Sequence, residues 1–88
     1  MPYINAAGRM HIDPAIDALT STIPIDALPE GDLNYLLTNI VKAWLGSKLN
    51  YARYNAAVGV LECVKLEFYR RVVTPYETVK MHDNGDVY

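Results

Sequence analysis

The sequence predicts a small all-α domain with two long antiparallel helices, flanked by short helices and assembling into a homo-oligomeric helical bundle. Three observations lead to this prediction. Two stretches carry apolar residues at helical spacing, near residues 32–45 and 51–73. The longer stretch has two opposite apolar stripes, so one stripe can face the chain's own core and the other a second subunit. The 88 residues form a single domain, 1–88, at a size where one core is only marginally sufficient.

The N-terminal part is expected to hold an extended arm and one short helix. Proline and glycine disfavour helix in residues 1–12, and Tyr3 is available to anchor this arm. Asp13 followed by Pro14 is a typical helix start, because Asp caps free backbone amides and Pro suits the first helical position. The sequence therefore predicts a short helix near residues 14–21.

The second helix has the most regular pattern in the chain. A loop with two prolines is expected over residues 21–29, and Gly46 is placed to end the helix in a left-handed conformation. The apolar positions follow the spacing of a helix that faces a core. They are Leu33, Leu36, Leu37, Ile40, Val41, Trp44 and Leu45.

The third helix is the longest. Asn50 can cap its start. Pro75 lacks an amide and disfavours helix at the residue before it, so the helix is expected to end near residue 73. A new capping pattern around the same proline predicts a short helix over 76–81, followed by a C-terminal tail over 82–88.

The two stripes of the third helix differ in size. The large stripe is expected to pack on the second helix and contains Tyr54, Val58, Leu61, Phe68 and Val72. The small stripe has no evident partner in the chain and is expected to allow close approach of another subunit in a two-fold dimer or a multiple of it. Its residues are Ala52, Ala56, Gly59 and Cys63.

Charge is distributed unevenly. Residues 1–41 have a net charge of −4 and residues 42–80 a net charge of +4, in a chain whose total is −2. One interpretation is an acidic half lying on a basic half, within or between subunits. The other is a basic site for an anionic ligand. Binding to DNA is not expected, because an acidic protein without a long basic face lacks the charge that neutralises phosphates.

A cytoplasmic location is expected. The longest apolar run is only a few residues, so no membrane span is predicted. The first residues lack the basic and apolar regions of a secretory signal. A single cysteine cannot form an internal disulfide, which agrees with a reducing compartment.

Catalytic or metal chemistry has weak support. Glu62 and Glu67 are five residues apart and point in different directions on a helix, so they do not converge on one ion. Lys65 and either Arg70 or Arg71 are placed to pair with them. The histidines and the cysteine lack the spacing of a zinc site. No catalytic residue, metal ligand or cofactor is assigned, and an all-α nucleotide hydrolase ranks third among the functions.

A basic and aromatic cluster on the third helix leads to the first functional hypothesis. Aromatic rings can stack bases and guanidinium groups can bind phosphates. The hypothesis is a non-catalytic homo-oligomer that binds a small anionic nucleotide-type ligand between subunits. The assigned residues are Arg70 as the first contact, with Arg53, Lys65, Tyr69 and Arg71. The alternatives are ordinary helix-end pairing of these arginines and a structural or protein-interaction module without a small ligand.

Several segments resemble a known family. They are MPYI at residues 1–4, GDLNYLLT at 31–38, GVLECVKLEFYRR at 59–71, PYE at 75–77 and NGDVY at 84–88. Together they are similar to a family of short proteins of unknown function found in bacteriophages and prokaryotic genomes. The resemblance implies a phage context in the host cytoplasm and carries no activity. By analogy of size and setting, it suggests an oligomeric sponge for the cyclic nucleotide signals of bacterial immunity.

Overall fold

The computed structural model describes residues 2–88, and this part of the chain is all helical. No strand occurs in it, so the all-α prediction is confirmed. Met1, at the start of the predicted arm, lies outside the described residues. The elements are α1 (Ala6–Thr22), the 3₁₀ turn η1 (Ile25–Ala27), α2 (Glu30–Leu45), α3 (Tyr51–Phe68), the π-helical segment η2 (Tyr69–Val73) and α4 (Thr74–Asn84).

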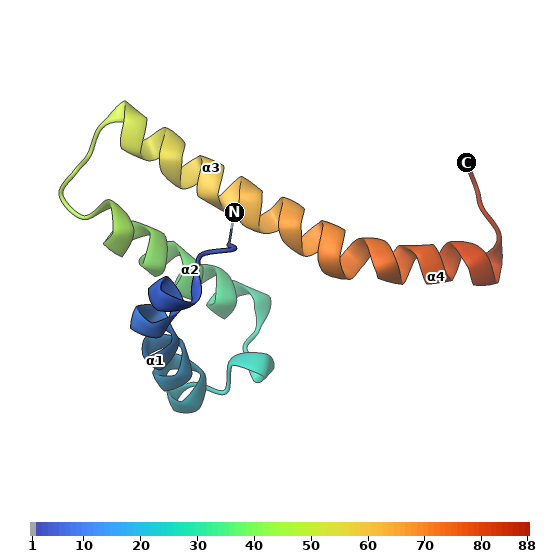
Figure 1. Ribbon diagram of the computed structural model, residues 1–88, viewed down its shortest axis with the longest axis horizontal. Coiled ribbons are helices and arrows are strands. Elements are labelled where there is room, and N and C mark those ends of the chain that lie inside the picture. Colours follow the sequence, from blue (N-terminus) through green and yellow to red (C-terminus); the bar gives the residue numbers. More distant parts are fainter. Residues whose placement is uncertain (1) are drawn as a thin grey trace.

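One continuous rod is formed by α3, η2 and α4 (Figure 1). At about 1.5 Å per residue, its length accounts for the longest dimension of the chain, 51 Å. The predicted break before Pro75 is therefore wrong, since Val73 and Thr74 both have right-handed helical angles. The amide of Thr74 donates to the carbonyl of Tyr69, five residues back. This wider π turn leaves room for the proline ring, which would otherwise press on the carbonyl four residues earlier.

Local signals set the C-terminal end of α2 and the start of α3 as the sequence predicts. Gly46 follows α2 with a φ of 56°, a backbone angle that glycine adopts readily. The Asn50 side chain accepts a 2.9 Å hydrogen bond from the amide of Arg53 and caps α3. α2 begins at Glu30, two residues before the predicted start.

The expectation of an extended arm over residues 1–12 is wrong. α1 begins at Ala6, and the side chain of Asn5 caps it by accepting a 2.9 Å hydrogen bond from the amide of Gly8. Pro14 lies inside this helix, so the expected start at Asp13 is misplaced. An internal proline removes one backbone hydrogen bond and its ring presses on the carbonyl four residues earlier, yet α1 continues through Pro14. With 17 residues, α1 is not a short flanking helix.

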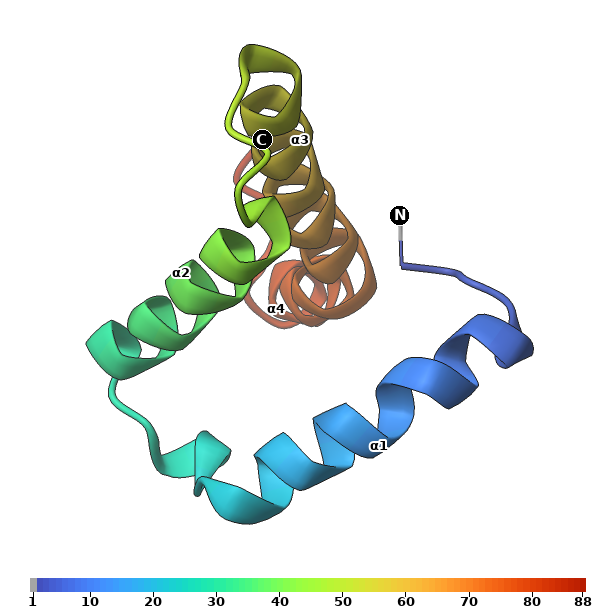
Figure 2. The ribbon, with the colours of Figure 1, turned by 90° about the vertical axis from the view of Figure 1, so that its left-hand side faces the viewer.

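α2 lies beside the first half of α3 (Figures 1 and 2). The contact between them is small. Ala57, which is 7% exposed, is the only buried residue in the part of the chain that the structure describes. Opposite it lie Ile40, Val41 and Trp44 of α2. These three belong to the predicted core face of α2.

The large stripe of α3 does not form the predicted core with α2. Its five side chains, Tyr54, Val58, Leu61, Phe68 and Val72, are 45–66% exposed. At about 100° per residue, Arg53, Ala57 and Val60 share a line that runs between the large and the small stripe. α2 packs on this intermediate line, and both stripes consequently remain outside the contact.

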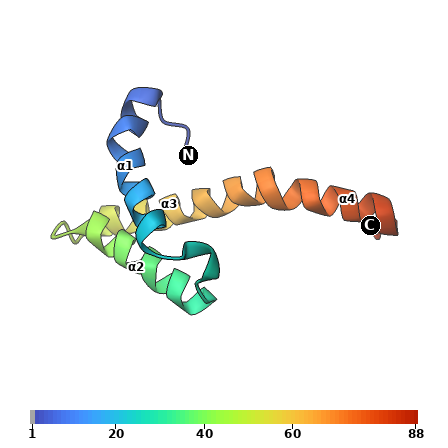
Figure 3. The same cartoon turned by 90° about the horizontal axis from the view of Figure 1, so that it is seen from below.

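α1 stands apart from the rod and is steeply inclined to it (Figures 2 and 3). Its C-terminal end meets α2 at a corner where Ile23, Leu28 and Leu36 are half-buried. The chain exposes 7745 Å², whereas a compact protein of 9.9 kDa exposes about 5200 Å². Its radius of gyration is 16.8 Å, against about 12 Å for a compact chain of this length. The single chain is thus open, with little core.

None of the helices in residues 2–88 is long and apolar enough to cross a membrane.

Candidate functional site

Arg53 joins the end of α2 to the start of α3. Its guanidinium carbon lies 3.7 Å from the centroid of the Trp44 ring. Its Nη2 donates a 2.7 Å hydrogen bond to the backbone carbonyl of Trp44. This carbonyl is among the last four of α2, which have no partner within the helix. The side chain that was assigned to a ligand therefore stacks on the tryptophan and caps the helix.

The acidic side chains of α3 pair with basic neighbours, as predicted. Lys65 Nζ lies 3.1 Å from Glu62 Oε1, and Arg70 forms an ion pair with Glu67. Each pair joins residues three positions apart on the helix surface, where such contacts add little stability. Lys65 and Arg70 thus have carboxylate partners within the chain.

A third side chain joins the Glu67–Arg70 pair from a distant part of the sequence. The Tyr3 hydroxyl donates a 2.5 Å hydrogen bond to Oε1 of Glu67, the same oxygen that accepts from Nη2 of Arg70. The residues before α1 are thereby attached to the C-terminal end of α3. The sequence indicates that Tyr3 can anchor the N-terminus, but nothing in it identifies Glu67 as the partner.

The cluster changes the pKa values of all three groups. The hydrogen bond from Tyr3, and then that from Arg70, lowers the pKa of Glu67 below its ordinary value. The bond to Glu67 raises the pKa of the Tyr3 hydroxyl, and the same carboxylate raises the pKa of Arg70. Glu67 is consequently held as a carboxylate between two donors.

The residues assigned to a nucleotide ligand are not brought together within one chain. Arg53 and Arg70 are 17 positions apart on one straight helix, which separates their backbones by about 25 Å. Tyr69 faces the C-terminal tail, and Arg71 is exposed on the rod. A site that contains all five would need groups from a second chain, and the nucleotide hypothesis stays a prediction.

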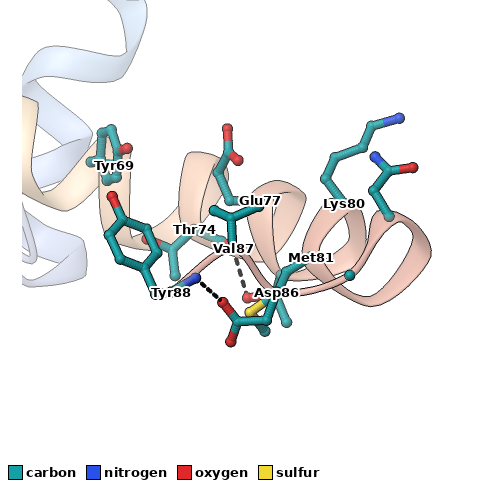
Figure 4. A pocket seen from close by; sticks show the side chains of 11 residues that line it. Tyr69, Thr74, Glu77, Lys80, Met81, Asp86, Val87 and Tyr88 are labelled. Atoms are coloured by element: carbon teal, nitrogen blue, oxygen red, sulfur yellow. Dashed lines mark hydrogen bonds between the residues drawn. The ribbon is translucent and has the colours of Figure 1, made fainter.

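A hollow of about 400 Å³ lies between α4 and the C-terminal tail (Figure 4). The rings of Tyr69 and Tyr88 lie close together at one end of it. Its charged lining consists of Glu77, Asp86 and Lys80. Because carboxylates outnumber the single ammonium group, the hollow does not favour an anion.

A smaller and almost wholly apolar groove of about 160 Å³ lies between α2 and α3. A volume of this size suits one or two apolar side chains. Its lining residues are Ile40, Val41, Trp44, Ala57 and Val60.

The small stripe on the neighbouring side of α3 is exposed along its whole length. A Cβ at Gly59 would meet no atom of the described residues within 4 Å. Cys63, the last residue of the stripe, is likewise exposed in the single chain. The stripe is therefore open to the close approach of another backbone, and its role as a subunit interface stays a prediction.

Within residues 2–88, no group of three or more His, Cys, Asp or Glu side chains lies close enough together to hold a metal ion.

Comparison with known proteins places the chain in a family. Residues 1–87 match a domain of unknown function (DUF6899). The chain belongs to this family. The match confirms the resemblance to a family of unknown function that the sequence segments indicated. No curated protein and no solved structure is significantly similar to this DUF6899 chain.

Proposed function

We propose that the protein is a non-catalytic interaction module whose apolar helix faces are covered by another polypeptide in a helical bundle. The observation that carries the proposal is the near absence of a core: among residues 2–88, only Ala57 is buried. Burial of apolar side chains is the main driving force of folding. A chain of 88 residues with one buried side chain has little of it.

The amount of exposed surface supports the same conclusion. The chain exposes about 2500 Å² more than a compact protein of its mass. Two chains that both covered this excess would bury about 5000 Å² in total, which lies in the range of obligate interfaces. A transient contact buries far less. The excess therefore fits a permanent partner rather than an occasional one.

The side chains also support an interaction module over a site for a small ligand. The basic groups proposed for a nucleotide are spread along the rod, and three of them already have partners: Arg53, Lys65 and Arg70. The hollow beside the tail has an acidic lining. Large apolar residues, by contrast, are exposed on every helix longer than ten residues. Apolar faces of this kind favour protein partners.

The first experiment is chemical denaturation of the isolated full-length chain at several concentrations, with light scattering and binding of an apolar dye. We expect either a mass above 9.9 kDa with a midpoint that rises with concentration, or a helical chain that binds the dye and unfolds without cooperativity. A monomer that unfolds cooperatively at a concentration-independent midpoint, without dye binding, would overturn the proposal.

The same protein preparation is used to test whether the chain binds a nucleotide. Thermal stability is measured with a panel of mono-, di- and cyclic nucleotides, and any recovered ligand is identified by chromatography. If a nucleotide binds through Arg70, Arg70→Ala weakens it at least about tenfold, the effect of a lost charge-assisted hydrogen bond. Lys48→Ala serves as the surface control. An interaction module without a small ligand shows no stabilisation by any member of the panel.

A further inference from the structure

Opposite charges lie in the two halves of the chain and do not meet inside it. In the part that the structure describes, ion pairs join close neighbours in the sequence: Lys65 with Glu62, Arg70 with Glu67, and His82 with Asp83. No ion pair within residues 2–88 links the acidic half, which ends at residue 41, to the basic half. Their net charges, −4 and +4, are equal and opposite. A second copy supplies the complementary charge to both halves at once.

The C-terminal part of the rod is an apolar arm without a neighbour in its own chain. The arm, residues 68–84, extends beyond the N-terminal end of α2 (Figure 1). The main contacts of α4 are with η2, the segment immediately before it. Four large side chains follow one another at helical spacings of four, four and three, and they are 54–60% exposed: Phe68, Val72, Tyr76 and Val79.

α2 carries a matching row that α3 covers only in part, since Ile40 and Trp44 also line the groove opposite Ala57. Its spacings are four, three and four, and its side chains are 44–50% exposed: Leu33, Leu37, Ile40 and Trp44. The apolar groove between α2 and α3 opens beside the second half of this row. We call these four residues the α2 row and the four on the arm the arm row.

The two rows have the same length. In each row the first and last residues are 11 positions apart, a distance of about 16 Å along the helix. A valine or tyrosine of the arm row is of a size to enter the 160 Å³ groove beside the α2 row. On the arm, the three basic residues Arg70, Arg71 and Lys80 outnumber the two acidic residues, Glu77 and Asp83. Glu30 and Asp32 are exposed at the start of α2. Apolar and charged groups are therefore complementary between arm and α2.

We propose that the partner of this chain is a second copy of itself and that the arm row of each copy packs on the α2 row of the other. This inference rests on the proposed function and names its partner. The arrangement is reciprocal and has two-fold symmetry, so two identical contacts form in each dimer. Each contact covers apolar side chains on both chains and places the arm, whose net charge is +1, over the acidic half of its partner.

The test is a mixing experiment with two full-length variants. Val72→Asp puts a charge in the middle of the arm row, and Leu37→Asp puts one in the middle of the α2 row. Alone, each variant has both contacts of the dimer disrupted, because a buried, unpaired carboxylate is strongly unfavourable. We expect each to lose the dimer mass and most of its helical circular dichroism. The control is Val87→Asp, the same change at a valine that is 91% exposed and outside both rows.

Mixing the two variants in equal amounts restores one contact. The intact arm of the Leu37→Asp chain meets the intact α2 row of the Val72→Asp chain. We expect at least about tenfold more dimer in the mixture than in either variant alone, with recovery of helical signal. An interface made of two arms or of two α2 helices cannot be rescued in this way, so no recovery in the mixture overturns the proposal. A loss of dimer in the Val87→Asp control as large as that in Val72→Asp also overturns it.

A second readout does not depend on the stability of the variants. In a Cys63→Ser background, Tyr76→Cys and Leu37→Cys chains are mixed under mild oxidation. Disulfide-linked dimers between the two kinds of chain are expected, because the middles of the two rows lie together. If wild type is a dimer and no such cross-link forms, the exchange of arms is wrong and the proposed function stands. If wild type alone is not assembled and binds an apolar dye, the second copy is wrong and the proposed function stands. A stable wild-type monomer overturns both.

Discussion

The two halves of the long rod both carry exposed apolar side chains but have very different surroundings. The first half is covered by α2, which places Arg53 and Ala57 in contact with another helix. The second half, the arm, carries a row of four large apolar side chains and has no helix beside it in its own chain. This chain therefore supplies a packing helix for only one half of the rod. Helix formation is local, whereas burial depends on what lies alongside.

The largest expected effect comes from the arm. Tyr76→Ala removes an aromatic side chain from the arm row. If a second copy covers the row, the free energy of unfolding falls by about 3 kcal/mol per chain, the cost of deleting a buried aromatic group. If the arm stays in water, the change is under about 0.5 kcal/mol. Chemical denaturation at fixed chain concentration measures the difference. Tyr51→Ala, at a tyrosine that is 79% exposed on the covered half, is the matched control.

Two adjacent alanines test which side of the covered half is occupied. Ala57→Leu places a large side chain in the contact with α2 and should cost about 1–3 kcal/mol through overpacking. Ala56→Leu changes a residue of the exposed small stripe and leaves the α2–α3 contact intact. Because Ala and Leu have similar helix propensities, the difference reports packing. Denaturation and light scattering are measured together, and a loss of assembly in Ala56→Leu alone would identify the small stripe as a subunit contact.

Arg53 tests the attachment between α2 and α3. Arg53→Ala removes a hydrogen bond to the Trp44 carbonyl and the stacking on its ring, and should cost about 1.5 kcal/mol. Arg53→Lys keeps the charge and should recover only part of the loss, because a lysine lacks the planar fork. Trp44 is the single tryptophan, so its fluorescence reports this contact directly. Equal effects of Arg53→Ala and Arg71→Ala, a change on the arm, would contradict a special role for Arg53.

The smallest expected effect concerns Glu67, near the border between the two halves. Its pKa is lowered in the folded chain, so its stabilising contribution is present above the ordinary carboxyl pKa and is lost as pH falls through the lowered value. The raised pKa of the Tyr3 hydroxyl affects stability in the opposite direction. Its stabilising contribution is present at lower pH and is lost only as the pH rises through the raised pKa. The thermal midpoint of wild type should therefore fall slightly more than that of Glu67→Gln between about pH 7 and pH 3. Parallel curves for the two proteins would show that the cluster adds no stability.

Much of the local structure was predictable from the residues alone. The apolar spacing from Leu33 to Leu45 and the stop at Gly46 define α2, and Asn50 caps α3 as expected. The pairing of Glu62 and Glu67 with basic neighbours also follows from helical spacing. Two local features differ from the prediction. Asn5 caps α1, and a π turn lets the long helix continue through Pro75.

The long-range contacts of the candidate site residues could not be predicted from the sequence. The sequence shows that the basic residues of the site lie on the long helix, but it does not show which distant groups they contact. Arg53 stacks on Trp44, nine positions earlier, and Glu67 accepts from Tyr3, 64 positions earlier. No helical periodicity encodes contacts of this separation. The placement of α2 on the line of Ala57, between the two stripes of α3, likewise required the three-dimensional arrangement.

The sequence by itself determined that the chain is helical, where α2 ends and α3 begins, and that the long helix has more apolar surface than one neighbour can cover. These properties depend on residues within one or two turns of each other, through backbone hydrogen bonds and caps. Only the tertiary structure decided which side of α3 meets α2, which arginine caps a helix end and which part of the rod has no neighbour. These depend on packing between distant segments, because a helix with several apolar lines can be covered along any of them and the free energy of the whole arrangement selects one.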